Sequence, residues 1–296
     1  MTDLPLITVV TPSFNQARFL ETTIRSVLGQ LYQRLEYLIF DGGSSDGSAE
    51  IIRRYAPQLS YWQSQPDGGQ AAAINAGFAR SSGDLLCWLN SDDFFLPGTL
   101  HRIAAQFSGR TAEPLLCYGS CLFFEDQGKH AKVVRPQAHD SAGLRLSAYV
   151  IQPSAFWTRA LWEKTGPLDA ELSFAFDWDW FIRASAAGEF ETCEEILSAY
   201  RLHAAHKSGS GGEKRRREIL EVVRRHGAPQ QVAAYEFAAR NWAAHERRRA
   251  LHDTLERRGI PAAGLWTRLF SAGSNAAPPG VTAEDLRRCA GMLRGS

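Results

Sequence analysis

The chain has 296 residues, 44% of them hydrophobic and 22% charged, a balance that is typical of a globular enzyme and excludes a disordered chain. The formal net charge is +1, but residues 1–206 carry 16 Lys and Arg against 23 Asp and Glu, whereas residues 207–296 carry 17 against 9. These counts indicate an acidic body with a basic tail. The sequence shows no basic segment before a long apolar run and no stretch of roughly 20 apolar residues, so we expect a cytoplasmic protein.

Strand-like and helical patterns alternate through the first hundred residues. β-branched and apolar runs predict strands, and apolar residues at helical spacing predict helices between them. The strands are expected within 6–14, 35–41, 60–65 and 85–89, and the helices within 16–30, 49–56 and 71–81. Four such alternations predict a parallel α/β sheet with helices on both faces.

A polar loop follows each of the four predicted strands. The loops read "TPSFN", "DGGSSDGS", "PDGGQ" and "NSDD". Because ligands bind at the carboxyl ends of the strands in such sheets, we expect the four loops to share one site. Asp92 and Asp93 end an apolar run, where carboxylates are costly without a partner, and a divalent cation on a nucleoside diphosphate would supply one. Taken singly, each loop also fits an ordinary turn, with Asp46 or Ser45 capping the next helix.

The pattern changes after residue 110. Residues 114–136 predict a hairpin, a helix is expected to begin near Asp177, and residues 196–203 predict a further strand. A Gly- and Ser-containing segment at 206–214 then precedes a long helical pattern over 233–259 and a last short helix. The five cysteines are scattered, which favours free thiols over a structural zinc site.

Four segments, in this order, resemble family 2 glycosyltransferases of the GT-A fold. They read "DGGSSDGS", "PDGGQAAAINAG", "GDLLCWLNSDDFFLPGTL" and "DWDWFIR", and the similarity covers roughly residues 5–208. The resemblance implies a mixed, mostly parallel, Rossmann-like sheet with helices on both faces. It also implies inverting transfer of a sugar from a nucleotide-diphosphate sugar, with UDP as the expected nucleotide. The acceptor would be a hydroxyl on a glycan, a lipid-linked glycan or a protein, and the cofactor Mn²⁺ or Mg²⁺.

The resemblance also assigns roles to residues of the four loops. Asp41 is expected to face the base or ribose, and Asp67 to contact the nucleotide or the sugar phosphate. Asn90 stands where many members have the first Asp of a D-x-D motif, near the ribose, and Asp92 is the expected metal ligand. The full expected donor site is Thr11, Pro12, Ser13, Asn15, Asp41, Asp67, Gln70, Asn90, Ser91 and Asp92.

Four further positions have open alternatives. Asp177 takes the place of the general base, although the Glu that usually precedes the base is Phe176 here; Asp177 and Asp179 could also be stabilised as first-turn residues of a helix. Asp93 could instead favour the start of the helix after residue 97. His203 is an expected metal or diphosphate ligand, or else a partly buried histidine with a backbone partner.

We divide the chain into a glycosyltransferase domain over residues 1–208 and a basic helical extension over 209–296. His206, Lys207 and Ser208 are expected in a loop that closes over the diphosphate. The Arg-rich segments "KRRR", "RRH" and "ERRR" fit either a solvated helical appendage or contact with anionic lipids, where each basic residue contributes about 1 kcal/mol. The second possibility would place the protein at the inner face of the membrane. No nucleic-acid partner is expected.

Two other functions fit a similar sheet. A sugar nucleotidylyltransferase would carry a Gly-rich, Arg-containing loop after the first strand, and "TPSFNQARF" has no glycine there. A non-catalytic nucleotide-sugar binding protein would not need Asp177. The release of nucleoside diphosphate, of pyrophosphate or of neither separates the three functions.

Overall fold

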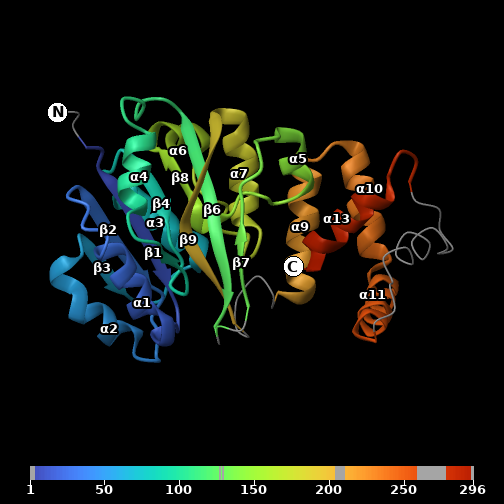
Figure 1. Cartoon of the computed structure of the whole chain (residues 1–296), viewed down its shortest axis with the longest axis horizontal. Helices are drawn as coiled ribbons and strands as arrows, with labels where there is room; N and C mark the ends of the chain where they lie inside the picture. The colour runs from blue at the N-terminus through green and yellow to red at the C-terminus, as the bar shows by residue number, and fades with distance from the viewer. Residues whose placement is uncertain (1–3, 127, 129, 204–210, 259–277, 295–296) are drawn as a thin grey trace. The chain divides into compact units, whose positions relative to one another are not determined.

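The computed structural model describes residues 4–126, 128, 130–203, 211–258 and 278–294 (Figure 1). The chain divides into two compact units. The first unit comprises Met1–Ser141 and Tyr149–His206, and the second comprises Ala142–Ala148 and Lys207–Ser296. The expected loop residues His206, Lys207 and Ser208 lie outside the described residues.

The first unit is built on one mixed sheet. Among the described residues the strand order is β3-β2-β1-β4-β8-β6-β9-β5, and β7 pairs with β6 beside this path. β1, β2, β3 and β4 are mutually parallel, and so are β6 and β9, whereas β8 joins these two groups by antiparallel pairing. The strands are β1 (Ile7–Ser13), β2 (Leu35–Asp41), β3 (Tyr61–Ser64), β4 (Leu85–Trp88), β5 (Phe94–Phe95), β6 (Leu115–Glu125), β7 (Ala131–Val134), β8 (Ala155–Thr158) and β9 (Glu189–Leu202).

Helices cover both faces of this sheet. On one face, Val9 of β1 belongs to the buried cluster that contains Leu20 and Ile24 of α1. On the other face, α3 approaches so closely that a Cβ on its Gly77 would lie 2.5 Å from Val10 Cγ1. Neighbouring strand residues point to opposite faces, so α1 covers one face of β1 and α3 packs closely on the other. The helices are α1 (Ala17–Leu28), α2 (Ser48–Tyr55), α3 (Gln70–Arg80), α4 (Thr99–Gln106), α6 (Arg159–Thr165) and α7 (Phe176–Ala187), with short 3₁₀ turns η1 (Ala56–Gln58) and η2 (Gln152–Ser154). The predicted α/β class is confirmed.

An aromatic core lies between the sheet and α7. Trp157 of β8 packs edge-on against Trp88 of β4, with ring centroids 5.3 Å apart. It also lies 4.7 Å from the ring of Trp180, and Phe181 stacks on Trp88 at 6.3 Å. Burial of several aromatic rings stabilises the contact between α7 and the strands more than any single polar contact does. The first turn of α7 is therefore fixed against β4.

The second unit is a small helical bundle. Its helices are α5 (Ser141–Leu146), α9 (Gly212–His226), α10 (Pro229–Arg240), α11 (Trp242–Arg257) and α13 (Ala283–Arg294). Its buried apolar residues include Leu144 and Leu146 of α5 together with Ile219, Val222, Val223, Ala234, Tyr235, Ala238, Leu286, Cys289 and Leu293. The Tyr235 hydroxyl donates to the Leu146 carbonyl, and Gln231 Nε2 donates to the Ala142 carbonyl at 3.3 Å. A segment from the middle of the sequence thus completes the C-terminal bundle.

The helical pattern over 233–259 breaks where the sequence alone predicts continuity. α10 ends at Arg240 and α11 begins at Trp242. Asn241 between them donates from its side chain to the Phe237 carbonyl at 2.9 Å. The Asn241 N–H keeps its helical bond to the same carbonyl, at 3.1 Å, but its ψ of 14° departs from the helical value, and α10 ends there.

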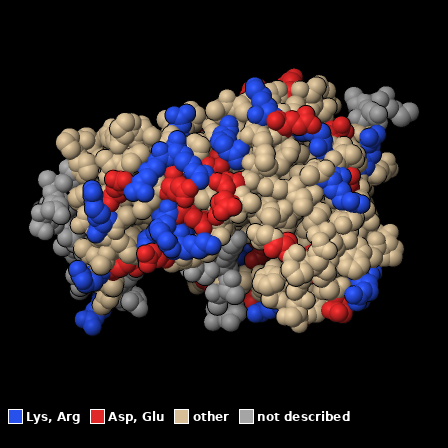
Figure 2. Space-filling view, turned by 180° about the vertical axis from the view of Figure 1, so that it is seen from behind, with Lys and Arg blue, Asp and Glu red and all other residues tan. Residues whose placement is uncertain are grey.

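Acidic partners accompany several arginines of the second unit. On the face shown in Figure 2, Lys and Arg lie interleaved with Asp and Glu. The ion pairs within this unit include Arg224 with Glu236, Arg225 with Glu221 and Arg294 with Glu246. Within the described ranges, no helix combines the length and apolarity that crossing a bilayer requires.

Candidate functional site

The carboxyl ends of the parallel strands form one edge of the sheet. In register, Ser13 lies beside Asp41, and Asp41 lies beside Ser64. β4 pairs with the other side of β1, with Trp88 beside Val10. The loops that follow these strands therefore start from a common edge.

Asp41 organises the loop that follows β2. Its side chain is fully buried. One carboxylate oxygen accepts from Ser44 Oγ at 2.5 Å, and the other accepts from the Ser44 N–H at 2.9 Å and from Ser64 Oγ at 2.6 Å. The structure thus shows Asp41 holding the loops after β2 and β3 together, and its contact with a base or ribose stays a prediction.

Asn15 connects the first loop to the second. Its backbone has φ of 52°, a left-handed conformation that Asn tolerates better than most residues. Its N–H donates to Ser44 Oγ at 2.7 Å, and its side-chain oxygen accepts from the Ser45 N–H at 3.0 Å. These reciprocal bonds fix the shape of "TPSFN" against "DGGSSDGS".

Asp46 stabilises the beginning of two helices. One oxygen accepts from the Ser48 N–H and hydroxyl at the start of α2, and the other accepts from the Ala17 N–H at the start of α1, at 2.8 Å. Burial alone would raise the pKa of Asp46, but the hydrogen bonds from Ser48 and Ala17 outweigh it and lower the pKa. The alternative that Asp46 stabilises the start of the next helix is therefore met, with Gly47 as the N-cap residue of α2, and Asp46 serves the start of α1 as well.

The remaining residues of the first loop differ in exposure. Thr11 is fully buried within the ladder of β1 and β2, with its hydroxyl 3.1 Å from Tyr37 Oη, so the structure shows Thr11 supporting the loop from inside the sheet. Pro12 is also buried. Ser13 is 5% exposed, and its Oγ has no hydrogen-bond partner among the described residues. Phe14 is 61% exposed, which is unusual for a large apolar side chain.

Phe14 lies close to Asp67 across Gly42. A Cβ on Gly42 would be 3.2 Å from Asp67 Oδ2 and 3.3 Å from Phe14 Cδ2. Asp67 is exposed, and its Oδ1 accepts from the Gly69 N–H at 2.7 Å. Because Gly42 has no side chain, there is room for the exposed ring of Phe14 beside the exposed carboxylate of Asp67.

The loop after β4 is fixed from several elements. Thr23 of α1 donates its hydroxyl to the carbonyls of Ser91 and Asp93, at 3.0 and 2.7 Å. Arg201 of β9 donates from Nε to the Asp92 carbonyl at 3.1 Å, and Ser91 itself is buried. The main chain of "NSDD" is thus held by α1 on one side and β9 on the other.

Asn90 lies within a chain of side-chain amides. Gln70 of α3 donates from Nε2 to Asn90 Oδ1 at 2.7 Å. Asn90 Nδ2 donates to Gln152 Oε1 at 3.3 Å, and Gln152 Nε2 donates to the Trp88 carbonyl at 2.7 Å. The structure therefore brings the predicted residues Gln70 and Asn90 into direct contact.

Asp93 is directed inward and does not cap a helix. It is 1% exposed, and its Oδ1 accepts from the Arg201 N–H at 3.1 Å, whereas α4 begins only at Thr99. Burial and the neighbouring charge of Asp92 raise the pKa of Asp93 well above its usual value, against the opposing effect of hydrogen bonds from Arg201 and Asn90. The expectation that Asp93 serves the start of the following helix is not met.

Asp92 and His203 form the pair that could hold a cation. His203 Nε2 lies 3.1 Å from Asp92 Oδ2, and the two side chains are 6% and 19% exposed. Two neighbouring ligands of an octahedral Mg²⁺, each about 2.1 Å from the ion, lie about 3.0 Å apart. Among the described residues no group of three His, Cys, Asp or Glu could hold a metal, so phosphate oxygens or water would complete the coordination. The pair fits a cation that is carried partly by a diphosphate.

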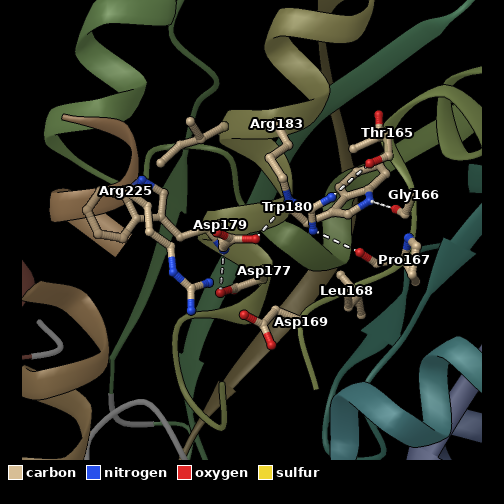
Figure 3. A network of polar contacts seen from close by, with 12 residues as sticks. Thr165, Gly166, Pro167, Leu168, Asp169, Asp177, Asp179, Trp180, Arg183 and Arg225 are labelled. Atoms are coloured by element: carbon tan, nitrogen blue, oxygen red, sulfur yellow. Dashed lines mark hydrogen bonds and ion pairs between the residues drawn. The ribbon is translucent and has the colours of Figure 1, made fainter. Parts of the chain in front are cut away.

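Asp177 and Asp179 lie in the first turn of α7, but their surroundings differ (Figure 3). The Asp177 carboxylate accepts from the Trp178 N–H at 2.7 Å and is partly exposed. Asp179 is 2% exposed and pairs with Arg183 Nε at 2.9 Å. Arg183 also donates to the Thr165 and Pro167 carbonyls, so Asp179 belongs to a structural network and Asp177 is the better candidate for a base.

Asp177 is linked to the donor loops by packing. The ring centroids of Phe176 and Trp88 lie 6.2 Å apart, and Trp88 stands two residues before Asn90 in the chain. Asn75 of α3 holds the segment before α7, because its side chain donates to the Leu168 carbonyl and accepts from the Leu168 N–H, at 2.9 and 3.0 Å. Strand β4, through Trp88, and helix α3, through Asn75 and Gln70, therefore contact both the segment of the predicted base and the "NSDD" loop.

Several residues of this site were missed in the sequence. A charged residue inside the strand-like "AYRLH" was a usable signal for Arg201, and an apolar residue in a polar loop was one for Phe14. Thr23, Asn75 and Gln152 act through contacts with distant segments, and local patterns carry no information on these contacts.

Comparisons with known proteins identify the family. The family described as "Glycosyl transferase family 2" matches residues 8–117. An uncharacterized glycosyltransferase of Mycobacterium tuberculosis is 31% identical over 231 residues, which cover 77% of this chain and 85% of the relative. Chondroitin synthase of Pasteurella multocida is 24% identical over 238 residues, which are 79% of this chain but 24% of that protein.

Solved structures show the same fold. TarS residues 1–349 of S. aureus, in complex with UDP-GlcNAc, aligns with a TM-score of 0.54 at 16% identity, over 80% of this chain and 72% of that one. The mannosyltransferase PcManGT of Pyrobaculum calidifontis, in complex with GDP-Man and Mn²⁺, aligns with a TM-score of 0.60 at 18% identity, over 98% and 87%. These neighbours confirm the predicted GT-A fold, and the identity to the mycobacterial relative confirms the predicted family. The chain belongs to glycosyl transferase family 2.

Proposed function

We propose that this protein transfers a sugar from a nucleoside-diphosphate sugar to a hydroxyl acceptor, with inversion at the anomeric carbon. The main support is the "NSDD" loop, whose main chain is fixed by Thr23 and Arg201 while the Asp92 carboxylate faces His203. A carboxylate and an imidazole are suitable ligands for Mn²⁺. In this proposal Asp92 and His203 hold the cation, and the bound cation supplies Lewis-acid stabilisation of the departing diphosphate.

The donor nucleotide is assigned to the loops after β1, β2 and β3. Ser13 offers a buried hydroxyl, and Phe14 offers an exposed ring beside Asp67. An aromatic face and a few polar groups are suited to a nucleoside, because the base stacks while the polar groups fix its orientation. UDP is the first choice, supported by the UDP-GlcNAc in the TarS structure, and GDP is the second, supported by the GDP-Man in PcManGT.

Asp177 is the proposed general base. An ordinary aspartate has a pKa near 3.9, so it cannot ionise a sugar hydroxyl in advance. It can accept the proton only while the new bond forms, when the hydroxyl becomes acidic. The partial exposure of Asp177 is compatible with an acceptor beside it, whereas Asp179 is buried against Arg183.

The acceptor is proposed to be a glycan, free or lipid-linked. For the basic extension, the ion pairs of Arg224, Arg225 and Arg294 with glutamates favour a helical support over an open basic surface. Sedimentation with vesicles that contain anionic lipid would test peripheral membrane contact directly. Salt-sensitive binding would support such contact.

A screen of UDP, GDP and their sugars, with and without Mn²⁺, tests the donor and the cation together. Ligands that bind the folded state raise its thermal unfolding midpoint. We expect one nucleotide to raise the unfolding midpoint. Mn²⁺ should strengthen this effect, and Asp92→Ala should remove it. Asp84→Ala is the matched control, because Asp84 accepts from the Leu6 N–H near the opposite end of β4 and should affect stability but not nucleotide binding.

Product analysis then separates the functions. Release of nucleoside diphosphate from the stabilising sugar nucleotide supports the transferase. Release of pyrophosphate would instead support a nucleotidylyltransferase, and tight binding without turnover would support a non-catalytic binding protein. Unchanged Mn²⁺-dependent affinity in Asp92→Ala would refute the metal assignment.

A further inference from the structure

The amide chain from Gln70 to Trp88 has a fixed direction. A backbone carbonyl can only accept, so the Trp88 carbonyl requires Nε2 of Gln152 to point toward it, at 2.7 Å. Gln152 must then direct Oε1 toward residue 90, where Asn90 Nδ2 donates at 3.3 Å. Asn90 in turn directs Oδ1 toward Gln70 Nε2, at 2.7 Å. Each amide orientation follows from the one before it.

This direction requires a donor on residue 90. Aspartate has two acceptor oxygens and, when ionised, no donor. An Asp at residue 90 would direct a carboxylate oxygen at Gln152 Oε1, which cannot turn without losing its bond to the Trp88 carbonyl. The same oxygen would face Asp93, because Asn90 Nδ2 lies 3.5 Å from Asp93 Oδ2. The contact with Gln152 would therefore change from favourable to unfavourable, and the contact with Asp93 would lose its amide donor.

Burial makes this requirement strict. Gln152 is 7% exposed and Asp93 is 1% exposed, so little water is available to replace a lost donor. Unpaired polar atoms cost more when buried than when solvated. The loop cannot relax easily, because Thr23 and Arg201 hold the carbonyls of its other residues.

We infer that Gln152 is a positioning residue of the donor site. It fixes the side chain of Asn90 through the Trp88 carbonyl and dictates that residue 90 be an amide. The loop then presents the Asp92 carboxylate alone toward His203, with Asn90 neutral and oriented. The link to the donor rests on the proposed function, but the dependence of residue 90 on residue 152 does not.

The dependence is measured with a double-mutant cycle on thermal unfolding. We expect Asn90→Asp and Gln152→Ala each to lower the midpoint by about 3–10 °C. Gln152→Ala removes Oε1, the oxygen that would oppose a carboxylate at residue 90. In that background Asn90→Asp should therefore lower the unfolding midpoint by about 3 °C less than it does in the wild type. Gln30→Glu is the matched control, since buried Gln30 also uses both ends of its amide, donating to the Ser26 and Leu96 carbonyls and accepting from the Leu100 N–H, and its effect should add to that of Gln152→Ala. Additive effects of Asn90→Asp and Gln152→Ala would overturn the inference.

Nucleotide affinity tests the positioning role. With Mn²⁺ present, calorimetry should show that Gln152→Ala binds UDP or GDP about tenfold more weakly than the wild type, whereas Gln30→Glu binds it normally. Wild-type affinity in a folded Gln152→Ala variant would show that Gln152 serves stability only. If the wild type binds neither nucleotide, the proposed function fails, and the unfolding cycle still decides whether residue 152 dictates residue 90.

Discussion

Arg201 offers the most informative single substitution outside the proposed ligands. It is replaced by Met, which keeps an unbranched side chain of similar length but removes every donor. The guanidinium donates to the Asp92 carbonyl at 3.1 Å and to Asp126 Oδ1 at 3.0 Å, and it lies 4.8 Å from the ring centres of both Phe19 and Phe124. Its side chain is only 12% exposed, so water replaces few of these contacts.

The magnitude follows from these contacts. A hydrogen bond that involves a charged group contributes about 1.5–3 kcal/mol, and a cation over an aromatic ring about 0.5–2 kcal/mol. Asp126 keeps Arg18 as a second partner, which limits the cost of leaving its charge behind. We therefore expect Arg201→Met to lower the free energy of unfolding by roughly 2–5 kcal/mol.

The functional effect is separate from the loss of stability. Without Arg201 the Asp92 carbonyl loses its bond from β9, so the carboxylate that faces His203 is held less firmly. Loss of an outer partner of a metal ligand typically costs 10- to 100-fold in metal affinity. We expect Mn²⁺ titration of the folded variant, followed by calorimetry, to show a loss of about tenfold or more.

Arg110→Met is the matched control. Arg110 pairs with Glu113, Glu189 and Glu191, the last two at the beginning of β9, whereas Arg201 lies near the end of that strand. The control should lose stability through its broken ion pairs but keep the Mn²⁺ affinity of the wild type. If Arg201→Met loses no more Mn²⁺ affinity than Arg110→Met, the reasoning about the Asp92 loop is wrong.

Three other outcomes are expected. Asp177→Asn should lower turnover on the order of 100-fold or more at nearly normal donor affinity, because the amide keeps the size of the side chain but not its basicity. Asp179→Asn should chiefly lower stability in denaturant, because Asp179 pairs with Arg183. If Asp179→Asn lowers turnover and Asp177→Asn does not, the base is residue 179. Burial raises the pKa of Glu36, but hydrogen bonds, first from Thr8, lower it overall. The advantage of the wild type over Glu36→Gln in unfolding free energy should therefore be present at pH 7 and decline as the pH falls below the ordinary pKa of Glu, about 4.3, and a pH-independent difference would contradict this. A chain ending at residue 210 should still hydrolyse the donor, but its thermal unfolding midpoint should be lower, because Leu146 loses the helices that cover it. A truncated chain that folds but does not hydrolyse the donor would show that the extension takes part in the chemistry.

The alternating patterns predicted the first half of the sheet well. β1, β2, β3 and β4 lie within the segments expected for them, because period-2 and period-3.6 apolar patterns directly reflect the faces that are buried. The hairpin of β6 and β7 and the start of α7 near Asp177 were also correct. The break at Asn241 was missed, because neither Gly nor Pro follows α10 and the helical pattern continues through residues 241 and 242.

The side-chain partners in the loops could not be predicted in the same way. The sequence places Asp41, Asp67, Asp92 and Asp93 in similar polar loops. The structure buries Asp41 and Asp93 completely or nearly so, and leaves Asp67 exposed. The difference comes from donors that are distant in sequence, such as Ser64 for Asp41 and the Arg201 backbone for Asp93.

Asp92 and Asp93 represent two different solutions to one electrostatic problem. Two ionised carboxylates on neighbouring residues repel each other, and burial of either one adds a desolvation cost. Asp93 is turned inward, where burial and Asp92 raise its pKa and the Arg201 N–H supplies a donor, while Asp92 is left at the surface beside His203. A neutral Asn90 next to this pair adds no third charge. A loop that reads as doubly acidic in sequence thus directs one carboxylate, that of Asp92, toward His203 and buries the other, which is suited to a cation already carrying the oxygens of a diphosphate.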